Sequence, residues 1–210
     1  CTATGQYPVH RYFEPLPDGF RYAEFNNLDS VKAIMDEYVC AILTEPVQGE
    51  GGVRPASREF LQGLRELCDE KDILLMFDEV QVGSGRTGKL FAHQYYGVEP
   101  DTCSMAKALG SGVPIAAVCA RGEAAKVLTP GTHGSTFAGG PLACALAATT
   151  LDVMLNEGVL DNCAEMGEYF RQQAHEVIEK HHPDAIQEIR GLGLIDGIQL
   201  KHPSGQPVVD

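Results

Sequence analysis

The sequence predicts an α/β fold built on a largely parallel sheet with helices on both faces. Two continuous apolar runs, at 39–43 and 73–77, are typical of strands that are buried on both sides. Stretches with apolar residues at helical spacing alternate with these runs, which is the order expected of a parallel sheet. Ligands of such sheets bind beyond the carboxyl ends of the strands, so the residues that follow each run are the first candidates for a site.

The remaining elements follow in order along the chain. Residues 1–28 are rich in proline, glycine and aromatic residues and predict an ordered but irregular segment. Ser30 is expected to cap a first helix that continues to Tyr38, and Ser57 is expected to cap the second helix. Later expectations are strands within 101–106 and 115–120, helices after Pro141 and Gly158, and a strand pair at 186–190 and 194–200.

Composition narrows the possible functions. The 210 residues include 16 Lys and Arg against 29 Asp and Glu, and the net charge of −13 argues against nucleic-acid partners and anionic membranes. No continuous apolar run reaches the roughly 18 residues of a membrane span. The seven cysteines form no CxxC motif and lie mostly among apolar residues. This pattern favours reduced core cysteines, a cytoplasmic location and no metal site.

The two ends and one internal break suggest how the chain is organised. It begins at Cys1 without a methionine and stops at Val208–Asp210 without a turn, so we expect a piece of a longer protein. Gly158 interrupts two helical stretches, and a glycine between helices is a natural boundary. The expected domains are therefore 1–157 and 158–210.

Acidic residues follow both apolar runs. Glu45 comes shortly after the first run and precedes a glycine-rich segment, while Asp78 and Glu79 directly follow the second. For a single acid, a helix cap or a surface turn is the simpler interpretation. Two acidic strand ends, each followed by glycines, favour a binding site, because a buried acid is costly without a partner.

Lys107 lies among small and apolar residues, just after a predicted strand. A lysine in dry surroundings loses solvation of its charged form, so its amine becomes nucleophilic. Such an amine can form a Schiff base with pyridoxal phosphate, which also needs an acid beside its ring nitrogen, and Asp78 could supply that acid. The segment His133–Thr136 offers hydroxyls and backbone N–H groups to a phosphate, although such loops are also common turns.

A second motif points to a different function. Gly83–Lys89 nearly matches the phosphate-binding loop of nucleotide hydrolases, and it follows a predicted strand. Leu90, however, stands where that motif has the Ser or Thr that holds magnesium. The acid pair Asp78–Glu79 also lies on the same strand as the loop. Nucleotide binding is therefore kept as an alternative.

Four segments occur in one order, and together they point to a known family. They are Glu45–Gly52, Asp78–Gln81, Ala106–Gly110 and His133–Phe137. In this order they resemble the class III, pyridoxal-phosphate-dependent aminotransferases, and within them the acetylornithine and ornithine aminotransferases. The resemblance implies the type I fold of pyridoxal-phosphate enzymes. Residues 1–157 would be an incomplete cofactor-binding large domain, and 158–210 the start of a small C-terminal α+β domain.

The resemblance also implies a role for each matching residue at the cofactor. Lys107 would be the catalytic residue that carries the cofactor covalently. Asp78 would pair with the ring nitrogen, and Gln81 would hydrogen-bond the phenolic oxygen. Ser135 and Thr136 would bind the phosphate of the cofactor in the neighbouring subunit of a homodimer.

Two acids would serve the substrate by the same resemblance. Glu45 would line the substrate pocket, and Glu50 would pair with an arginine when no α-carboxylate is bound. The implied reaction transfers an amino group from an ornithine-like donor, acetylornithine first, to 2-oxoglutarate, giving an aldehyde and glutamate. The alternatives are a related class III enzyme for ornithine, succinylornithine or 4-aminobutyrate, and a non-catalytic fragment that only packs with a partner.

Overall fold

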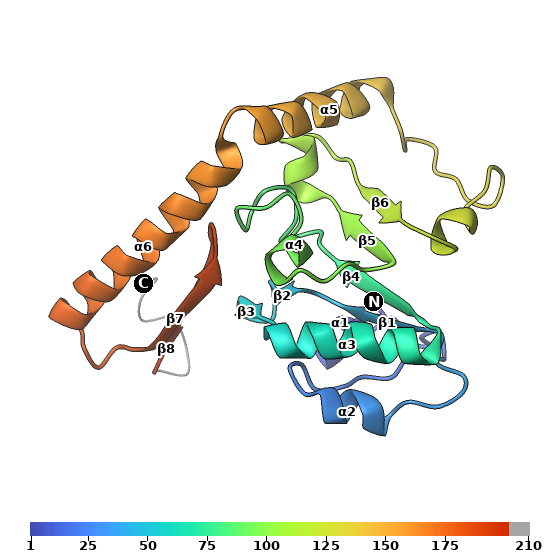
Figure 1. The fold of residues 1–210 in the computed structure, drawn as a ribbon, viewed down its shortest axis with the longest axis horizontal. Helices are drawn as coiled ribbons and strands as arrows, with labels where there is room; N and C mark the ends of the chain where they lie inside the picture. Colours follow the sequence, from blue (N-terminus) through green and yellow to red (C-terminus); the bar gives the residue numbers. More distant parts are fainter. Residues whose placement is uncertain (202–210) are drawn as a thin grey trace.

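A four-stranded sheet forms the centre of the molecule in the computed structural model, which describes residues 1–201 (Figure 1). The strand order is β1 (Ala41–Thr44), β4 (Leu74–Asp78), β5 (Thr102–Met105) and β6 (Ala117–Ala120). The first three of these strands run parallel, and β6 is antiparallel to β5. The prediction of a largely parallel sheet with strands at both apolar runs is therefore confirmed.

Helix α3 (Arg58–Lys71) covers one face of this sheet. It begins after Ser57, whose hydroxyl accepts a hydrogen bond from the Phe60 N–H, as predicted. Its buried apolar side packs on Leu75 and Phe77 of β4, which are 0% and 1% exposed. Complete burial of such side chains contributes about 1.5–3 kcal/mol each. The strand end that carries Asp78 is thus held on a rigid base.

The predicted start and length of the first helix are wrong. Helix α2 (Leu28–Ala33) is capped by Asn27, whose side chain accepts from the Ser30 N–H. Ser30 lies inside the helix, and its hydroxyl accepts from the Glu24 N–H instead. Serine and asparagine are both strong caps, so the sequence alone does not choose between sites three residues apart.

Short elements fill the connections. They are α1 (Tyr7–His10), α4 (His93–Tyr96), the 3₁₀ turns η1 (Lys107–Gly110) and η2 (Ala124–Lys126), and an antiparallel pair of β2 (Val47–Gln48) and β3 (Arg54–Pro55). Apart from the single turn α1, residues 1–27 contain no helix or strand, in agreement with the predicted irregular segment.

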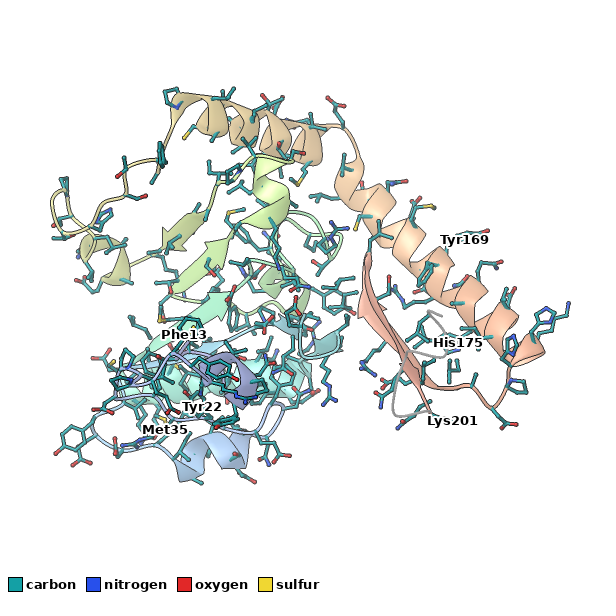
Figure 2. All side chains as sticks on the ribbon, turned by 180° about the vertical axis from the view of Figure 1, so that it is seen from behind. Phe13, Tyr22, Met35, Tyr169, His175 and Lys201 are labelled. Atoms are coloured by element: carbon teal, nitrogen blue, oxygen red, sulfur yellow. The ribbon has the colours of Figure 1, made fainter. Side chains whose placement is uncertain are left out.

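Two long helices lead away from the sheet. Helix α5 (Pro141–Asn156) packs on η1 through Ala147 and Leu109, and α6 (Val159–His181) leaves at a bend of 67°. Gly158 lies at this bend with a φ of +73°, so the predicted break is confirmed. Figure 1 shows the two helices as an elbow. Figure 2 shows Tyr169 on α6, where its side chain is 58% exposed.

The predicted C-terminal strand pair is also present. β7 (Ile186–Leu192) and β8 (Ile195–Leu200) form an antiparallel hairpin that packs beside α6, apart from the central sheet (Figure 1). The segment Val208–Asp210 lies outside the described residues.

The glycine-rich loop 83–88 is a packing element. An added Cβ at Gly88 would come within 2.9 Å of the Ala164 Cβ, and one at Gly85 within 3.0 Å of Leu160. Both neighbours belong to α6, so the glycines let the loop pack closely against this helix. Helix α4, the next helix in the chain, has only four residues. This geometry does not support the alternative of nucleotide binding.

The cysteines are all free, as expected, but fewer of them are buried than the sequence predicts. Cys68, Cys103 and Cys163 are buried, and the other four are exposed. Burial raises the pKa of the Cys68 thiol to about 11, so it remains protonated and unreactive near neutral pH. Among residues 1–201, no cluster of three His, Cys, Asp or Glu side chains could hold a metal ion.

Within the described part of the chain, no single helix is long and apolar enough to cross a membrane. The α5–α6 pair passes that test only when both helices are taken together across their bend.

Candidate functional site

Lys107 stands at the carboxyl end of β5, where η1 begins. Its backbone has a φ of +44°, a left-handed conformation that is uncommon for a residue with a side chain and is often found at functional sites. Its Nζ donates a hydrogen bond of 3.1 Å to Gln81 Oε1. The side chain is exposed in residues 1–201, so the described chain does not itself supply the dry surroundings expected from the sequence.

Asp78 ends β4, the neighbouring strand, and its carboxylate is held on one side only. Oδ1 accepts from the Val80 N–H and from the Ser104 hydroxyl, each at 3.0 Å. No residue within 1–201 donates a hydrogen bond to Oδ2. One carboxylate oxygen is therefore fixed by the protein, and the other makes no hydrogen bond within residues 1–201.

Gln81 and Glu45 both contact Gly49. An added Cβ at Gly49 would lie 2.4 Å from the Gln81 carboxamide carbon, so only glycine allows this approach. The Gly49 N–H donates to Glu45 Oε2 at 3.0 Å. The loop after β1 is thereby packed directly on the residue that contacts Lys107.

Glu45 is an acid in unfavourable surroundings. Burial raises the pKa of its carboxyl group, and the nearby Asp78 carboxylate raises it further, while the Gly49 N–H and the Lys107 ammonium oppose the rise. Glu45 therefore holds its proton to a higher pH than an ordinary glutamate does. Perturbed carboxyl groups of this kind gather at functional sites.

A cavity of about 410 Å³ opens beside these groups. Gln81 and Lys107 line one side of it, and Val53 and the β8 residues Ile195 and Asp196 line another. Its size falls within the range of small-molecule sites, roughly 300–1,000 Å³. The cavity thus joins a primary amine and a carboxamide to a wall made by the C-terminal hairpin.

Three of the predicted site residues are not brought to this group by contacts. Ser135 and Thr136 lie exposed in the loop between β6 and α5, and neither side chain makes a hydrogen bond within residues 1–201. Glu50 is also exposed, although its charge lies close enough to Glu45 to raise the pKa of that carboxyl group. Their proposed roles stay predictions.

Glu79 has a structural part that the sequence does not reveal. It is 0% exposed, and Oε2 accepts from the Ala92 N–H at 2.5 Å. Oε1 accepts from the His93 N–H at 2.9 Å and pairs with His93 Nδ1 at 2.7 Å. An acid in an apolar setting, one residue after Asp78, was the available signal. Its partner is fourteen residues away and carries no pattern of its own.

Comparison with known proteins identifies the family. The family model described as aminotransferase class-III matches residues 4–209. An acetylornithine aminotransferase of Methanocaldococcus jannaschii is 48% identical over 90% of this chain and 47% of its own length. Acetylornithine aminotransferase 1 of Bradyrhizobium diazoefficiens is 49% identical over 98% of this chain and 51% of its own length.

A solved structure shares the fold. The ornithine aminotransferase of Toxoplasma gondii superposes with a TM-score of 0.90 at 37% identity, over 99% of this chain and 49% of that one. The chain spans about half the length of the curated relatives that it matches. The type I fold expected from the sequence is confirmed, and the chain belongs to the class III aminotransferases.

Proposed function

We propose that the protein to which this chain belongs is a pyridoxal-phosphate-dependent aminotransferase. It moves the terminal amino group of an ornithine-like donor, acetylornithine, to 2-oxoglutarate, giving an aldehyde and glutamate. The observation that carries the proposal is the meeting of Lys107 Nζ with Gln81 Oε1 beside the one-sided Asp78 carboxylate. These three groups match the needs of one cofactor.

The residues present fit pyridoxal phosphate. Its aldehyde needs a primary amine, which Lys107 offers at the wall of the cavity. Its ring nitrogen needs a carboxylate with a free oxygen, which is Asp78 Oδ2. Its phenolic oxygen needs a donor beside that amine, which the Gln81 carboxamide can provide. Ser135 and Thr136 of the partner subunit would supply hydroxyls for the phosphate.

When bound, pyridoxal phosphate supplies an electron-withdrawing ring that stabilises negative charge on the donor carbon. In this proposal Lys107 Nζ binds the cofactor and also accepts and returns a proton at that carbon. Asp78 holds the proton on the ring nitrogen, because its second oxygen is unpaired and its first is fixed. Gln81 orients the ring plane, and Glu45 presents a carboxyl group to the polar part of the substrate.

The choice of donor rests on the relatives. Three curated relatives at 46–49% identity are named acetylornithine aminotransferases. The ornithine aminotransferases of known structure are 37–40% identical. Acetylornithine aminotransferases of known structure are also 38% identical, so the names of the curated relatives alone favour acetylornithine as the donor. The ornithine-like skeleton is common to both groups.

We extend the proposal to the organisation of the whole protein. Residues 1–157 form part of the cofactor domain, and 158–210 begin a small domain at the Gly158 bend. The exposed Thr136 loop, with Phe137 at 92% exposure, supports a homodimer in which this loop serves the neighbouring site. Seven free cysteines support a cytoplasmic location.

The test uses full-length protein with added pyridoxal phosphate. We expect a visible absorption band that is absent in Lys107→Ala, and we expect acetylornithine to give the highest kcat/KM in a panel with ornithine, succinylornithine and 4-aminobutyrate. The acceptor in each assay is 2-oxoglutarate. A missing Lys107-dependent band would overturn the function, and a higher kcat/KM for another donor would overturn only the substrate.

A further inference from the structure

Arg190 of β7 joins the C-terminal hairpin to the loop that follows β2. Its Nε donates to the Val53 carbonyl at 2.9 Å, and its Nη2 donates to the Gly52 carbonyl at 2.7 Å. On the other side, Nη1 donates to Glu188 Oε2 and to Gln199 Oε1 at 2.8 and 2.7 Å. The Arg190 side chain is only 15% exposed. One guanidinium thus bridges backbone carbonyls 137 and 138 residues away in the sequence.

The loop that Arg190 holds is strained. Val53 has a φ of +49°, and for a β-branched residue a positive φ is a genuine outlier. Such a conformation persists only where the surroundings impose it. The Arg190 hydrogen bond to its carbonyl is one constraint. The close approach of β8 is another, since an added Cβ at Gly197 would lie 3.1 Å from the Val53 Cβ.

A continuous series of contacts leads from this loop to the candidate site. The Gly52 and Val53 N–H groups both donate to the Gly49 carbonyl, at 3.0 and 3.1 Å. The Gly49 N–H donates to Glu45, and the Gly49 Cα packs on the Gln81 carboxamide. Val53 itself lines the cavity that contains Lys107. A movement of the Gly52 and Val53 carbonyls would therefore also move Val53 and, through Gly49, Glu45.

We propose that Arg190 is a positioning residue, which holds loop 49–53 so that Glu45 and Val53 present a fixed wall to the amino donor. This rests on the proposed function, since the donor is the aminotransferase substrate. Arg190 touches neither Lys107 nor Asp78, and the residues nearest to it in this series are Val53 and Glu45, so its effect falls first on donor binding. The hairpin that carries Arg190 thereby sets the geometry of a loop in the sheet domain.

The test compares Arg190→Gln with Arg171→Gln in full-length protein loaded with pyridoxal phosphate. Arg171 is a matched control, because it is 18% exposed and also bonds a carbonyl and two acids, but it makes no contact with loop 49–53. For Arg190→Gln we expect hydrogen exchange at the Gly52 and Val53 amides to accelerate about tenfold. We expect the KM of the donor to rise about tenfold while kcat changes less than about threefold.

Each outcome decides the matter. Unchanged exchange in segment 49–53, or the same change in Arg171→Gln, would overturn the positioning role. Where Arg190→Gln does not fold, Arg190→Lys replaces it, because lysine keeps the charge and can reach one carbonyl but cannot bridge two. If the unmutated protein shows no Lys107-dependent absorption band, the proposed function is refuted. The hydrogen-exchange comparison would still show whether Arg190 holds the loop.

Discussion

Ser104 on β5 lies directly opposite Asp78 on β4, and its hydroxyl donates a 3.0 Å hydrogen bond to Asp78 Oδ1. The register of two parallel strands thus decides which oxygen of the acid is fixed. The next backbone contact reinforces this arrangement, because the Glu79 N–H donates to the Ser104 carbonyl at 3.0 Å. Ser104 is also only three residues before Lys107, so one strand positions both the amine and the acid.

Ser104→Ala should weaken cofactor binding without unfolding the protein. A hydrogen bond to a charged group contributes about 1.5–3 kcal/mol, and one of the two that fix Asp78 is lost, so the Kd for pyridoxal phosphate should rise about tenfold. Ser104→Thr keeps the hydroxyl and should bind like the unmutated protein. Thr102→Ala, two residues earlier on the same strand, is the control in a fluorescence titration. Equal losses in Thr102→Ala and Ser104→Ala would refute the orienting role.

Glu79→Ala should be strongly destabilising. The substitution removes the acceptor of two backbone N–H groups and of His93 Nδ1 in a site that is closed to water. Each buried donor left unsatisfied costs about 1–3 kcal/mol, so we expect a loss of about 3 kcal/mol or more in the free energy of unfolding. Urea denaturation measures it. Glu66→Ala, at an exposed position of α3, should change the stability little, and a similar loss there would contradict the argument.

Asp101 should make stability depend on acid pH. Burial by itself would raise the pKa of this carboxyl group, but hydrogen bonds from the Leu75 N–H and the Arg65 guanidinium hold it below the usual value. A lowered folded-state pKa stabilises the protein above the unfolded pKa of about 3.9, and this contribution is lost as the pH falls through the folded value. Asp101→Asn should therefore be less stable than the parent at pH 6, with the gap closing below about pH 4.

The control for this experiment is Asp69→Asn. Asp69 pairs with the same Arg65 at 2.7 Å, but its side chain is 66% exposed, so solvent screens the pair. Thermal unfolding from pH 3 to pH 7 should show no comparable gap for Asp69→Asn. A gap for Asp101→Asn that stays constant down to pH 3 would show that the carboxylate charge is not its source.

The part of the site that sequence could predict is the part that follows from strand ends. Asp78 and Lys107 end neighbouring parallel strands, and carboxyl ends of parallel strands meet at one edge of a sheet, so their meeting needs no long-range information. Ser57 could be recognised as a cap for a similarly local reason. Gln81 is three residues beyond Asp78, within the same turn.

The contacts that sequence could not predict join distant segments through groups without a pattern. Arg190 binds backbone carbonyls, which every residue has, so nothing in the sequence marks Gly52 and Val53 as its partners. The glycines at 85 and 88 suggested an anion loop, whereas the structure uses their missing side chains to admit α6. The cap of α2 was misplaced because two suitable residues stood three positions apart.

Thr136 and Lys107 share no contact within one chain. We therefore expect that, in a dimer, the two residues of one chain serve different active sites. Phe137 beside Thr136 is 92% exposed, and Leu142 at the start of α5 is 71% exposed. Apolar side chains at such exposure are typical of surfaces that a partner covers. If the loop serves the neighbouring subunit, each site takes Lys107 from one chain and Thr136 from the other.

Mixed dimers of Lys107→Ala and Thr136→Asp should therefore recover activity that neither variant has alone. Aspartate would repel the cofactor phosphate, so each parent dimer is inactive at both sites. Random pairing makes half of the dimers mixed, and each mixed dimer holds one intact site of two, so activity should reach about one quarter of the unmutated level.

The control mixes Lys107→Ala with Asp78→Ala. Each site takes both Lys107 and Asp78 from the same chain, so pairing the two variants cannot produce an intact site. In that control the mixed dimer has one site lacking Lys107 and one lacking Asp78, so it should stay inactive. No recovery with Thr136→Asp would place the loop in its own chain's site, and recovery in the control would show that mixing restores activity without any exchange of the loop.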